Sequence, residues 1–119
     1  MVLHAITDSI LGALSQRDIG TYFPNTKRNL NRNSIDFLNY ALKKMTLRKM
    51  LINNIDIMIV SEEPKINPHR VNILKSLSLI LEIPIDKIGL KATTSEQIGI
   101  IGKNKAIAVQ SYVNLREKQ

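Results

Sequence analysis

The chain opens with an amphipathic helical pattern. Apolar positions recur every three or four residues from about residue 2 to residue 15, which predicts a first helix, and they are Leu3, Ile6, Ile10, Leu11 and Leu14. His4 and Asp8 lie one turn apart on this helix, so both side chains can point into one site. Residues 18–20 are expected to end the helix in a turn, with Gly20 supplying permissive backbone angles. Polar residues 24–33 are expected to form a surface loop.

A second helix and a first strand are predicted next. Ser34 is the expected N-cap of the helix, and its apolar stripe consists of Phe37, Leu38, Ala41, Leu42 and Met45. Residues 51–60 form a β-branched run, which is typical of a buried strand. Residues 61–67 are expected to form a loop. Pro68 suits the first turn of a third helix, whose apolar face holds Val71, Leu74, Leu77, Ile80 and Leu81, and Pro84 ends it.

The C-terminal third predicts two strands and a short helix. Residues 88–92 form one strand, and residues 106–115 form the other through their alternating pattern. Residues 93–96 match the Ser/Thr-x-x-Glu capping box, so a short helix should begin there. The resulting order predicts an α/β (α+β) sandwich, with a mixed sheet and helices packed on one face. Three strands leave one face uncovered, so another strand or a second subunit should cover it.

Composition excludes some functions but does not indicate a particular reaction. A chain of 119 residues fits a single domain, 1–119. Cysteine is absent, so neither a disulfide nor a thiolate metal site is possible. No apolar run reaches the roughly 20 residues of a membrane span, so we expect no membrane partner. The net charge of +7 favours an anionic partner, either a phosphorylated metabolite or nucleic acid, or reflects a solvated surface.

Two groups of residues suggest a metal or phosphate chemistry. His4 is a candidate zinc ligand because a neutral imidazole binds divalent metals, and Asp8 could orient it. The alternative is an unliganded pair on a helix surface. Where a strand meets a helix N-terminus, the backbone N–H groups and hydroxyls of residues 93–95 could hold phosphate, and Glu96 could bind a hard cation. The alternative there is a capping box without a ligand.

Several short polar runs occur in an order and separation that resemble one enzyme family. These runs are Leu3-His4-Ala5-Ile6-Thr7-Asp8, Asp18-Ile19-Gly20, Phe23-Pro24, Lys91-Ala92-Thr93-Thr94-Ser95-Glu96 and Gly99. They resemble those of the 2-C-methyl-D-erythritol 2,4-cyclodiphosphate synthases, metal-dependent enzymes of the non-mevalonate isoprenoid pathway. The resemblance covers essentially all of the chain, with one apparent deletion near Asn31. It implies a cyclodiphosphate-synthase-like homotrimer with active sites between neighbouring subunits.

The resemblance also implies a reaction and a set of site residues. The implied enzyme is a phosphorus–oxygen lyase, which converts the cytidine diphosphate-linked substrate 4-diphosphocytidyl-2-C-methyl-D-erythritol 2-phosphate to the cyclodiphosphate and CMP. Thr94 would be catalytic, His4 would bind zinc, and Glu96 would bind magnesium or manganese on the diphosphate. The implied substrate-binding residues are Asp8, Asp18, Ile19, Gly20, Phe23, Pro24, Asn25, Thr26, Lys27, Ser61, Glu62, Glu63, Pro64, Lys65, Ile66, Asn67, Lys91, Thr93, Thr94, Ser95, Glu96, Ile100 and Lys103.

The chain also departs from the family pattern. Asn25 stands where an Asp is usual, and Lys103 stands where an Arg would grip a phosphate with two donors. The family's Asp-x-His pair and Gly-His-Ser-Asp loop would precede Met1, so the chain is expected to lack the first strand and the loop after it. The polypeptide as written is therefore expected to turn over weakly or not at all.

Two alternatives remain at this point. One is an impaired or inactive remnant of the enzyme, and the other is a small basic nucleic-acid-binding domain, although the low aromatic content of 4% argues against single-strand binding. The expected location is the bacterial cytoplasm or a plastid-type organelle.

Overall fold

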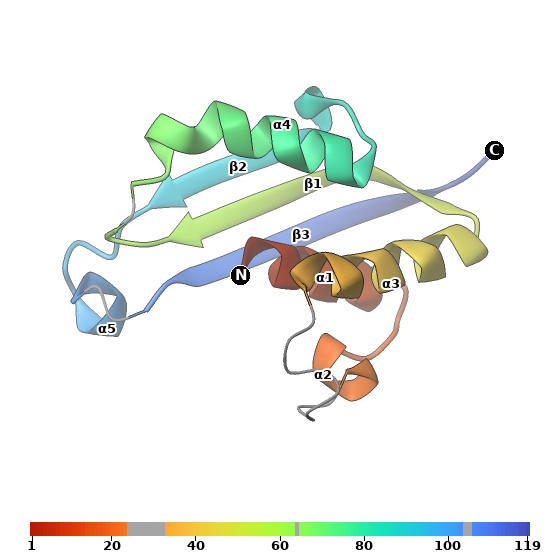
Figure 1. The fold of residues 1–119 in the computed structure, drawn as a ribbon, viewed down its shortest axis with the longest axis horizontal. Helices are drawn as coiled ribbons and strands as arrows, with labels where there is room; N and C mark the ends of the chain where they lie inside the picture. The colour runs from red at the N-terminus through yellow and green to blue at the C-terminus, as the bar shows by residue number, and fades with distance from the viewer. Residues whose placement is uncertain (24–32, 64, 104–105) are drawn as a thin grey trace. The chain divides into compact units, whose positions relative to one another are not determined.

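The computed structural model describes residues 1–23, 33–63, 65–103 and 106–119 (Figure 1). The loop expected at residues 24–33 lies outside them except for Asn33. Contacts between backbone positions divide the chain into two compact units. Unit 1 consists of residues 1–53 and 112–119, and unit 2 consists of residues 54–111.

Unit 1 is built on two packed helices. Helix α1 spans Val2–Ala13 and packs against α3, which spans Ser34–Leu47. Both helices were predicted, and their apolar stripes supply most of the core of this unit, which comprises Ile6, Ile10, Leu11, Leu14, Phe37, Leu38, Ala41, Met45 and Ile52. The Arg48 side chain donates a hydrogen bond to the Leu14 backbone oxygen, so the ends of the two helices are tied together.

Two local predictions in unit 1 need correction. Asn33, rather than Ser34, caps α3: its side-chain oxygen accepts a hydrogen bond from the Ile35 backbone N–H at 3.1 Å. Both residue types are good N-caps, so the sequence pattern could not separate them. Residues 18–20 do not end the first helix, because α1 ends at Ala13 and a short helix α2 begins after Asp18 and spans Ile19–Tyr22.

Three strands form a mixed sheet in the order β2-β1-β3. Strand β1 spans Met50–Val60, β2 spans Ile88–Thr93, and β3 spans Ala108–Glu117. Strands β1 and β2 run parallel, with Ile55 opposite Ile88 and Val60 opposite Thr93. The Lys118 backbone N–H, just past β3, donates to the Lys49 oxygen, just before β1, at 2.8 Å. Strand β3 therefore runs antiparallel to β1, which confirms the predicted mixed sheet.

Unit 2 contains a strand–helix–strand segment. A 3₁₀ turn at Asn67–His69 leads into α4, which spans Arg70–Leu81 and packs against β2 (Figure 1). A second 3₁₀ turn, Ile85–Lys87, leads into β2, and α5 spans Gly99–Gly102. Alternate residues of β1 point to the core because side chains of a strand alternate between faces. The core of the unit comprises Ile55, Ile57, Ile59, Leu74, Leu77, Leu81, Ile88 and Leu90.

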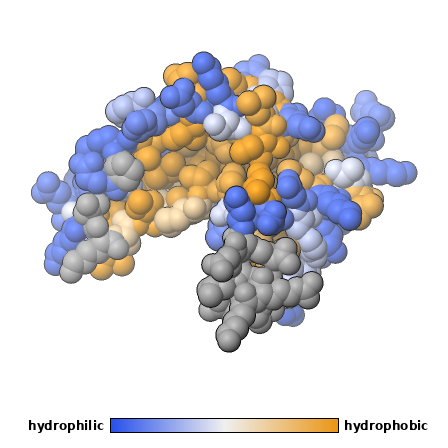
Figure 2. Space-filling model, viewed as in Figure 1, coloured by the Kyte–Doolittle hydropathy of each residue, from blue (hydrophilic) through white to orange (hydrophobic). Residues whose placement is uncertain are grey.

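Two predictions in unit 2 also differ from the structure. Val71 is 61% exposed, so it does not belong to the buried face of α4. Figure 2 shows hydrophobic as well as hydrophilic residues on the surface over α4. The short helix predicted to begin at residues 93–96 is absent there: Thr93 ends β2, and α5 begins only at Gly99. Within the described residues, no helix is long and apolar enough to cross a membrane.

Candidate functional site

In unit 2, the carboxyl ends of two parallel strands place two predicted site segments side by side. Val60 and Thr93 are partners at the end of the β1–β2 ladder. The Ser61 backbone N–H continues the ladder by donating to the Thr93 oxygen at 3.0 Å. In open α/β sheets, ligands bind outside the carboxyl ends of the strands. The register therefore puts the segment after β1 and the segment after β2 where a ligand site is expected.

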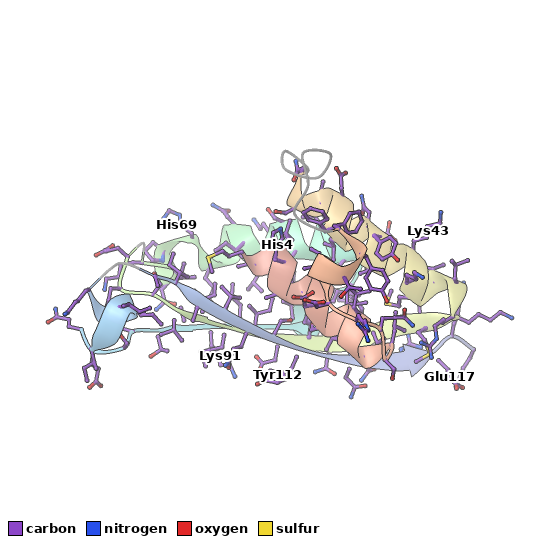
Figure 3. The ribbon with its side chains drawn as sticks, turned by 90° about the horizontal axis from the view of Figure 1, so that it is seen from below. His4, Lys43, His69, Lys91, Tyr112 and Glu117 are labelled. Atoms are coloured by element: carbon purple, nitrogen blue, oxygen red, sulfur yellow. The ribbon has the colours of Figure 1, made fainter. Side chains whose placement is uncertain are left out.

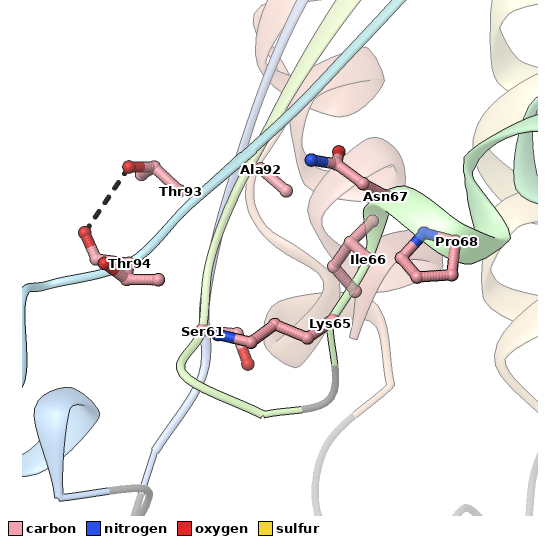
Figure 4. Close-up of a pocket in the computed structure, with 8 residues that line it drawn as sticks. All are labelled: Ser61, Lys65, Ile66, Asn67, Pro68, Ala92, Thr93 and Thr94. Carbon is pink, nitrogen blue, oxygen red and sulfur yellow. Dashed lines mark hydrogen bonds between the residues drawn. The ribbon is translucent and has the colours of Figure 1, made fainter.

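A pocket of about 310 Å³ opens between these two segments (Figure 4). Its lining comprises Ser61, Lys65, Ile66, Asn67, Pro68, Ala92, Thr93 and Thr94. The volume lies in the range of small-molecule sites. Six of these residues were implied as substrate-binding by the resemblance. The other two, Pro68 and Ala92, were not, although each directly follows or precedes an implied residue in the chain.

The two threonines form the β2 wall of the pocket. Both are exposed, and the Thr93 hydroxyl lies 3.4 Å from the Thr94 backbone oxygen, to which it donates (Figure 4). The Thr94 hydroxyl accepts a hydrogen bond from the Glu96 backbone N–H at 3.2 Å. The pocket thus presents hydroxyl groups and the Lys65 side chain, a combination that can bind phosphate oxygens through donors and positive charge.

The segment after the threonines is a loop rather than the predicted helix N-terminus. Glu96 and Gln97 both have left-handed backbone angles, with φ of 55° and 64°. The backbone N–H groups of Ser95 and Gln97 point to the Glu62 carboxylate, at 3.1 and 3.0 Å. The capping box is not formed, because the Glu96 backbone N–H, which the Thr93 hydroxyl would accept in a capping box, donates to the Thr94 hydroxyl instead.

The remaining predicted residues of unit 2 lie around this loop or on the sheet. The Lys91 ammonium forms an ion pair with Asp56 at 3.0 Å on the exposed surface of β2 and β1. Ile100, in α5, is 66% exposed, and Lys103 follows α5. Glu63 is exposed, and its backbone oxygen accepts from the Ser61 hydroxyl at 2.6 Å. Pro64 lies outside the described residues.

In unit 1, His4 and Asp8 are both exposed on α1, but each has its own partner. His4 Nε2 lies 3.2 Å from the Ser34 hydroxyl, and which atom donates depends on the tautomer. The His4 side chain is labelled in Figure 3. Its ring meets Phe37 edge-on, with 5.4 Å between the ring centres. Asp8 Oδ1 accepts a hydrogen bond from the Ile19 backbone N–H at 2.8 Å. Asp8 thereby fixes the start of α2.

The other predicted residues of unit 1 belong to α2 and its surroundings. Asp18 accepts a hydrogen bond from the Thr21 hydroxyl at 2.8 Å, and a Cβ placed on Gly20 would lie 3.5 Å from Asp18 Oδ2. Phe23 packs edge-on against Phe37 and Tyr40, with ring centres 4.8 and 5.2 Å apart. Ile19 begins α2. The predicted residues Pro24, Asn25, Thr26 and Lys27 lie outside the described residues.

The charged groups do not form a metal cluster in the described parts of the chain. No three His, Asp or Glu side chains come together there as a metal-binding group. His4 and His69 belong to different units, and His69 ends the 3₁₀ turn before α4. The described residues therefore do not make up a three-ligand zinc site. Glu96 offers a single exposed carboxylate, which suits a magnesium ion that keeps water or phosphate oxygens as its other ligands.

Comparison with known proteins identifies the family. The YgbB family model matches residues 1–116. The chain belongs to the YgbB family. One YgbB relative, the 2-C-methyl-D-erythritol 2,4-cyclodiphosphate synthase of Hydrogenobaculum sp. (strain Y04AAS1), is 52% identical over 96 residues, which is 80% of this chain and 62% of the relative. The resemblance inferred from the polar runs is thus confirmed.

Two further comparisons extend the match. The bifunctional enzyme IspD/IspF of Wolbachia pipientis wMel is 45% identical over 116 residues, which is 97% of this chain and 29% of that protein. The structure of Plasmodium falciparum IspF in complex with CDP superposes with a TM-score of 0.89 at 40% identity, covering 99% of this chain and 71% of that chain. This YgbB chain spans less than two thirds of the length of the Hydrogenobaculum and Wolbachia relatives.

Proposed function

We propose that this chain provides the cyclodiphosphate synthase reaction: conversion of 4-diphosphocytidyl-2-C-methyl-D-erythritol 2-phosphate to 2-C-methyl-D-erythritol 2,4-cyclodiphosphate and CMP. The observation that carries the proposal is the pocket at the carboxyl ends of β1 and β2, in a chain that superposes on an IspF–CDP complex. We infer that residues 1–119 act as one domain, with the helices on one face of the sheet. The proposed assembly is a homotrimer with sites between subunits.

The pocket residues are assigned distinct roles in this reaction. The segment of residues 61–67 encloses the cytosine, and its backbone reads the base edge. Thr93 and Thr94 contact the diphosphate, and Lys65 adds positive charge on the opposite wall. The 2-phosphate attacks the β-phosphorus, and CMP leaves with the bonding electrons. The Thr94 hydroxyl stabilises the charge that develops on the transferred phosphoryl oxygens, so Thr94 is the proposed catalytic residue.

The erythritol side of the substrate is assigned to unit 1. Asp18 and Gly20 are proposed to hold its hydroxyl groups, and Phe23 belongs to the same segment. The Asp18 carboxylate is exposed and accepts one hydrogen bond, from Thr21. A carboxylate oxygen has two lone pairs, so acceptor capacity remains for a ligand hydroxyl. Asp8 contributes by fixing Ile19 next to Asp18.

Metal ions have two proposed places. Glu96 fits a magnesium or manganese ion on the diphosphate, since it is an exposed oxygen donor close in sequence to the pocket threonines. A metal bound there would neutralise phosphate charge. His4 is proposed as one zinc ligand, but the described residues do not complete that site. Relatives include bacterial and apicoplast enzymes, and the bacterial cytoplasm or a plastid-type organelle is the proposed location.

The test combines ligand binding with turnover. CDP and ADP are titrated separately into the full chain with zinc and magnesium present, and CMP release is measured with the proposed substrate. CDP should bind at least about tenfold more tightly than ADP, because a base-edge hydrogen bond pattern rejects the wrong base. Equal affinities would contradict the cytosine assignment. CDP-selective binding without CMP release would instead support the inactive remnant.

A matched pair of threonine variants tests the catalytic assignment. Thr94→Ala should lower the CMP release rate by about 10²-fold or more while changing CDP affinity little, since it removes a group needed mainly in the transition state. Thr46→Ala is the control, because Thr46 lies on α3 in unit 1 and its hydroxyl donates to the Leu42 backbone oxygen of the same helix at 2.9 Å. An equal loss in both variants would reject the role of Thr94.

A further inference from the structure

One carboxylate oxygen in unit 2 gathers three polar groups of the loop after β2. Glu62 Oε1 accepts the backbone N–H groups of Ser95 and Gln97, at 3.1 and 3.0 Å, and lies 3.3 Å from the Ser95 hydroxyl. We propose that Glu62 is a positioning residue, which holds the loop carrying Thr94 and Glu96 against the 61–67 segment. The inference rests on the proposed function, because it assigns how that ligand site is kept in shape.

The loop conformation needs such a support. Glu96 and Gln97 are consecutive non-glycine residues with φ of 55° and 64°. Left-handed angles of this kind are costly for residues with a Cβ and persist only where the surroundings fix them. Backbone N–H groups that converge in a turn can bind an anion, and here the N–H groups of Ser95 and Gln97 converge on one oxygen. In this chain the Glu62 carboxylate is the anion, so its charge and the loop conformation support each other.

The far side of the loop is held by close packing. A Cβ placed on Gly102 would lie 2.0 Å from the Gln97 carbonyl carbon, so α5 rests directly on the Gln97 backbone. The Ile98 backbone N–H donates to the Ser95 oxygen at 3.1 Å. The Ser95 hydroxyl lies 3.0 Å from the Ile98 oxygen as well as near Glu62, so its one proton is shared between two acceptors. Glu62 therefore holds one end of a loop whose other end α5 already fixes.

The position of Glu62 explains why this carboxylate can link the two walls of the pocket. It directly follows Ser61, which is 6% exposed and whose backbone N–H bonds the Thr93 oxygen at 3.0 Å. The base of the Glu62 side chain is thus anchored to the β1–β2 ladder, while its carboxylate reaches the loop two to four residues beyond Thr93. The resemblance implied a substrate contact for Glu62; the geometry points to an indirect role through Thr94 and Glu96.

Amide hydrogen exchange tests the holding role without requiring any ligand. In Glu62→Ala, exchange at the Ser95 and Gln97 amides should accelerate by about tenfold or more, because hydrogen bonds to a charged acceptor are lost. Amides in α4 should exchange as in the wild type. Glu62→Gln keeps an acceptor oxygen without the charge and should accelerate exchange by only about threefold. Glu117→Ala and Glu117→Gln, at an exposed residue of β3, are the matched controls.

CDP binding to the same variants tests the consequence for the site. Affinity should fall by about tenfold in Glu62→Ala, recover largely in Glu62→Gln, and stay within about twofold in the Glu117 controls. If Glu62→Ala does not fold, Glu62→Asp, which withdraws the carboxylate by one methylene, should show both losses. Unchanged exchange at Ser95 and Gln97 would overturn the inference. Accelerated exchange with unchanged CDP affinity would overturn the link to the ligand site.

The two hypotheses fail in different ways. If the wild-type chain shows no preference for CDP, the proposed function fails, and amide exchange still decides whether Glu62 holds the loop. If CDP binds selectively but exchange at Ser95 and Gln97 does not respond to Glu62→Ala, the proposed function stands and the positioning role is rejected.

Discussion

The two units of the chain present their predicted site residues in different ways. In unit 2, the residues lie on segments that leave the carboxyl ends of parallel strands, and a pocket of about 310 Å³ forms between those segments. In unit 1, the residues are side chains of α1 and α2 that interact with their own neighbours: Asp8 with the Ile19 N–H, His4 with Ser34, and Phe23 with Phe37 and Tyr40. Unit 2 forms a pocket at its strand ends, whereas in unit 1 these predicted site residues contact neighbouring residues of the same unit.

The difference follows from the two kinds of backbone. Parallel strands end together at one edge of a sheet, so the loops that follow them lie close together there. The polar groups of those loops are therefore brought near one another. Helices place side chains at the surface, where each polar group can find a partner one turn away or on a neighbouring helix. Substitutions that create a clash with the backbone should therefore lower stability most in unit 2. Substitutions that remove a single hydrogen-bond acceptor should lower stability only modestly in unit 1.

The largest contrast is expected between two glycines. Gly102→Ala would bring a Cβ within 2.0 Å of the Gln97 backbone, whereas nothing lies within 4 Å of a Cβ on Gly12 in α1. Gly102→Ala should destabilise the protein by about 1–3 kcal/mol or distort the loop, because the clash is with backbone. Gly12→Ala should stabilise it by about 0.5–1 kcal/mol, because alanine loses less backbone entropy in a helix. Urea unfolding measures both changes.

The same pair sharpens the assignment of the ligand site. CDP affinity should fall in Gly102→Ala and remain at the wild-type value in Gly12→Ala. A Gly102→Ala chain as stable as the wild type, with full CDP affinity, would show that the loop tolerates displacement. In that case the pocket of unit 2 would not depend on the close packing of its loop, and the contrast with unit 1 would not hold.

Local patterns predicted the regular elements well because burial follows periodicity. Most residues of the stripes of α1 and α3 and of the β-branched run of β1 are buried as expected, with Ile6, Leu38 and Ile57 each 0% exposed. Leu3, Leu42 and Val60 are only partly buried. The Thr93–Glu96 run failed as a capping box for a physical reason. Glu96 and Gln97 take left-handed backbone angles there, and the Ser95 and Gln97 N–H groups on either side of Glu96 bind Glu62, which lies 33 and 35 residues earlier in the chain. A partner so distant in the sequence leaves no local signal.

The candidate site shows the same limit. The polar runs predicted most of the residues around the pocket, because their types and order resemble a family. They did not separate residues that line the pocket, such as Lys65, from residues that support it, such as Glu62. That distinction depends on the register of Val60 opposite Thr93, and register is a property of paired strands that no single segment encodes.

A middle-sized effect is expected for the acceptor that fixes α2. Asp8→Ala removes the partner of the Ile19 backbone N–H, 2.8 Å away, and should lower the free energy of unfolding by about 1 kcal/mol, as for loss of a helix cap. Asp8→Asn keeps a side-chain oxygen and should lose less than half as much. Urea unfolding of both variants measures the difference. A stable Asp8→Ala chain with weakened ligand binding would mean that Asp8 acts on the ligand, and the comparison between the units would need revision.

The smallest effect is expected for the ion pair between Lys91 and Asp56 on the exposed surface of unit 2. The two charged atoms lie 3.0 Å apart, but the side chains are 58% and 45% exposed, so water and salt weaken the attraction. A double-mutant cycle with Lys91→Ala and Asp56→Ala should give a coupling of about 0.5 kcal/mol or less, falling further at high salt. If the coupling instead exceeded about 1 kcal/mol and resisted salt, this pair would be a structural support of the β1–β2 ladder. Lys91 would then belong with Glu62 among the residues that hold the site, because its charge would be committed to the sheet rather than to a bound phosphate.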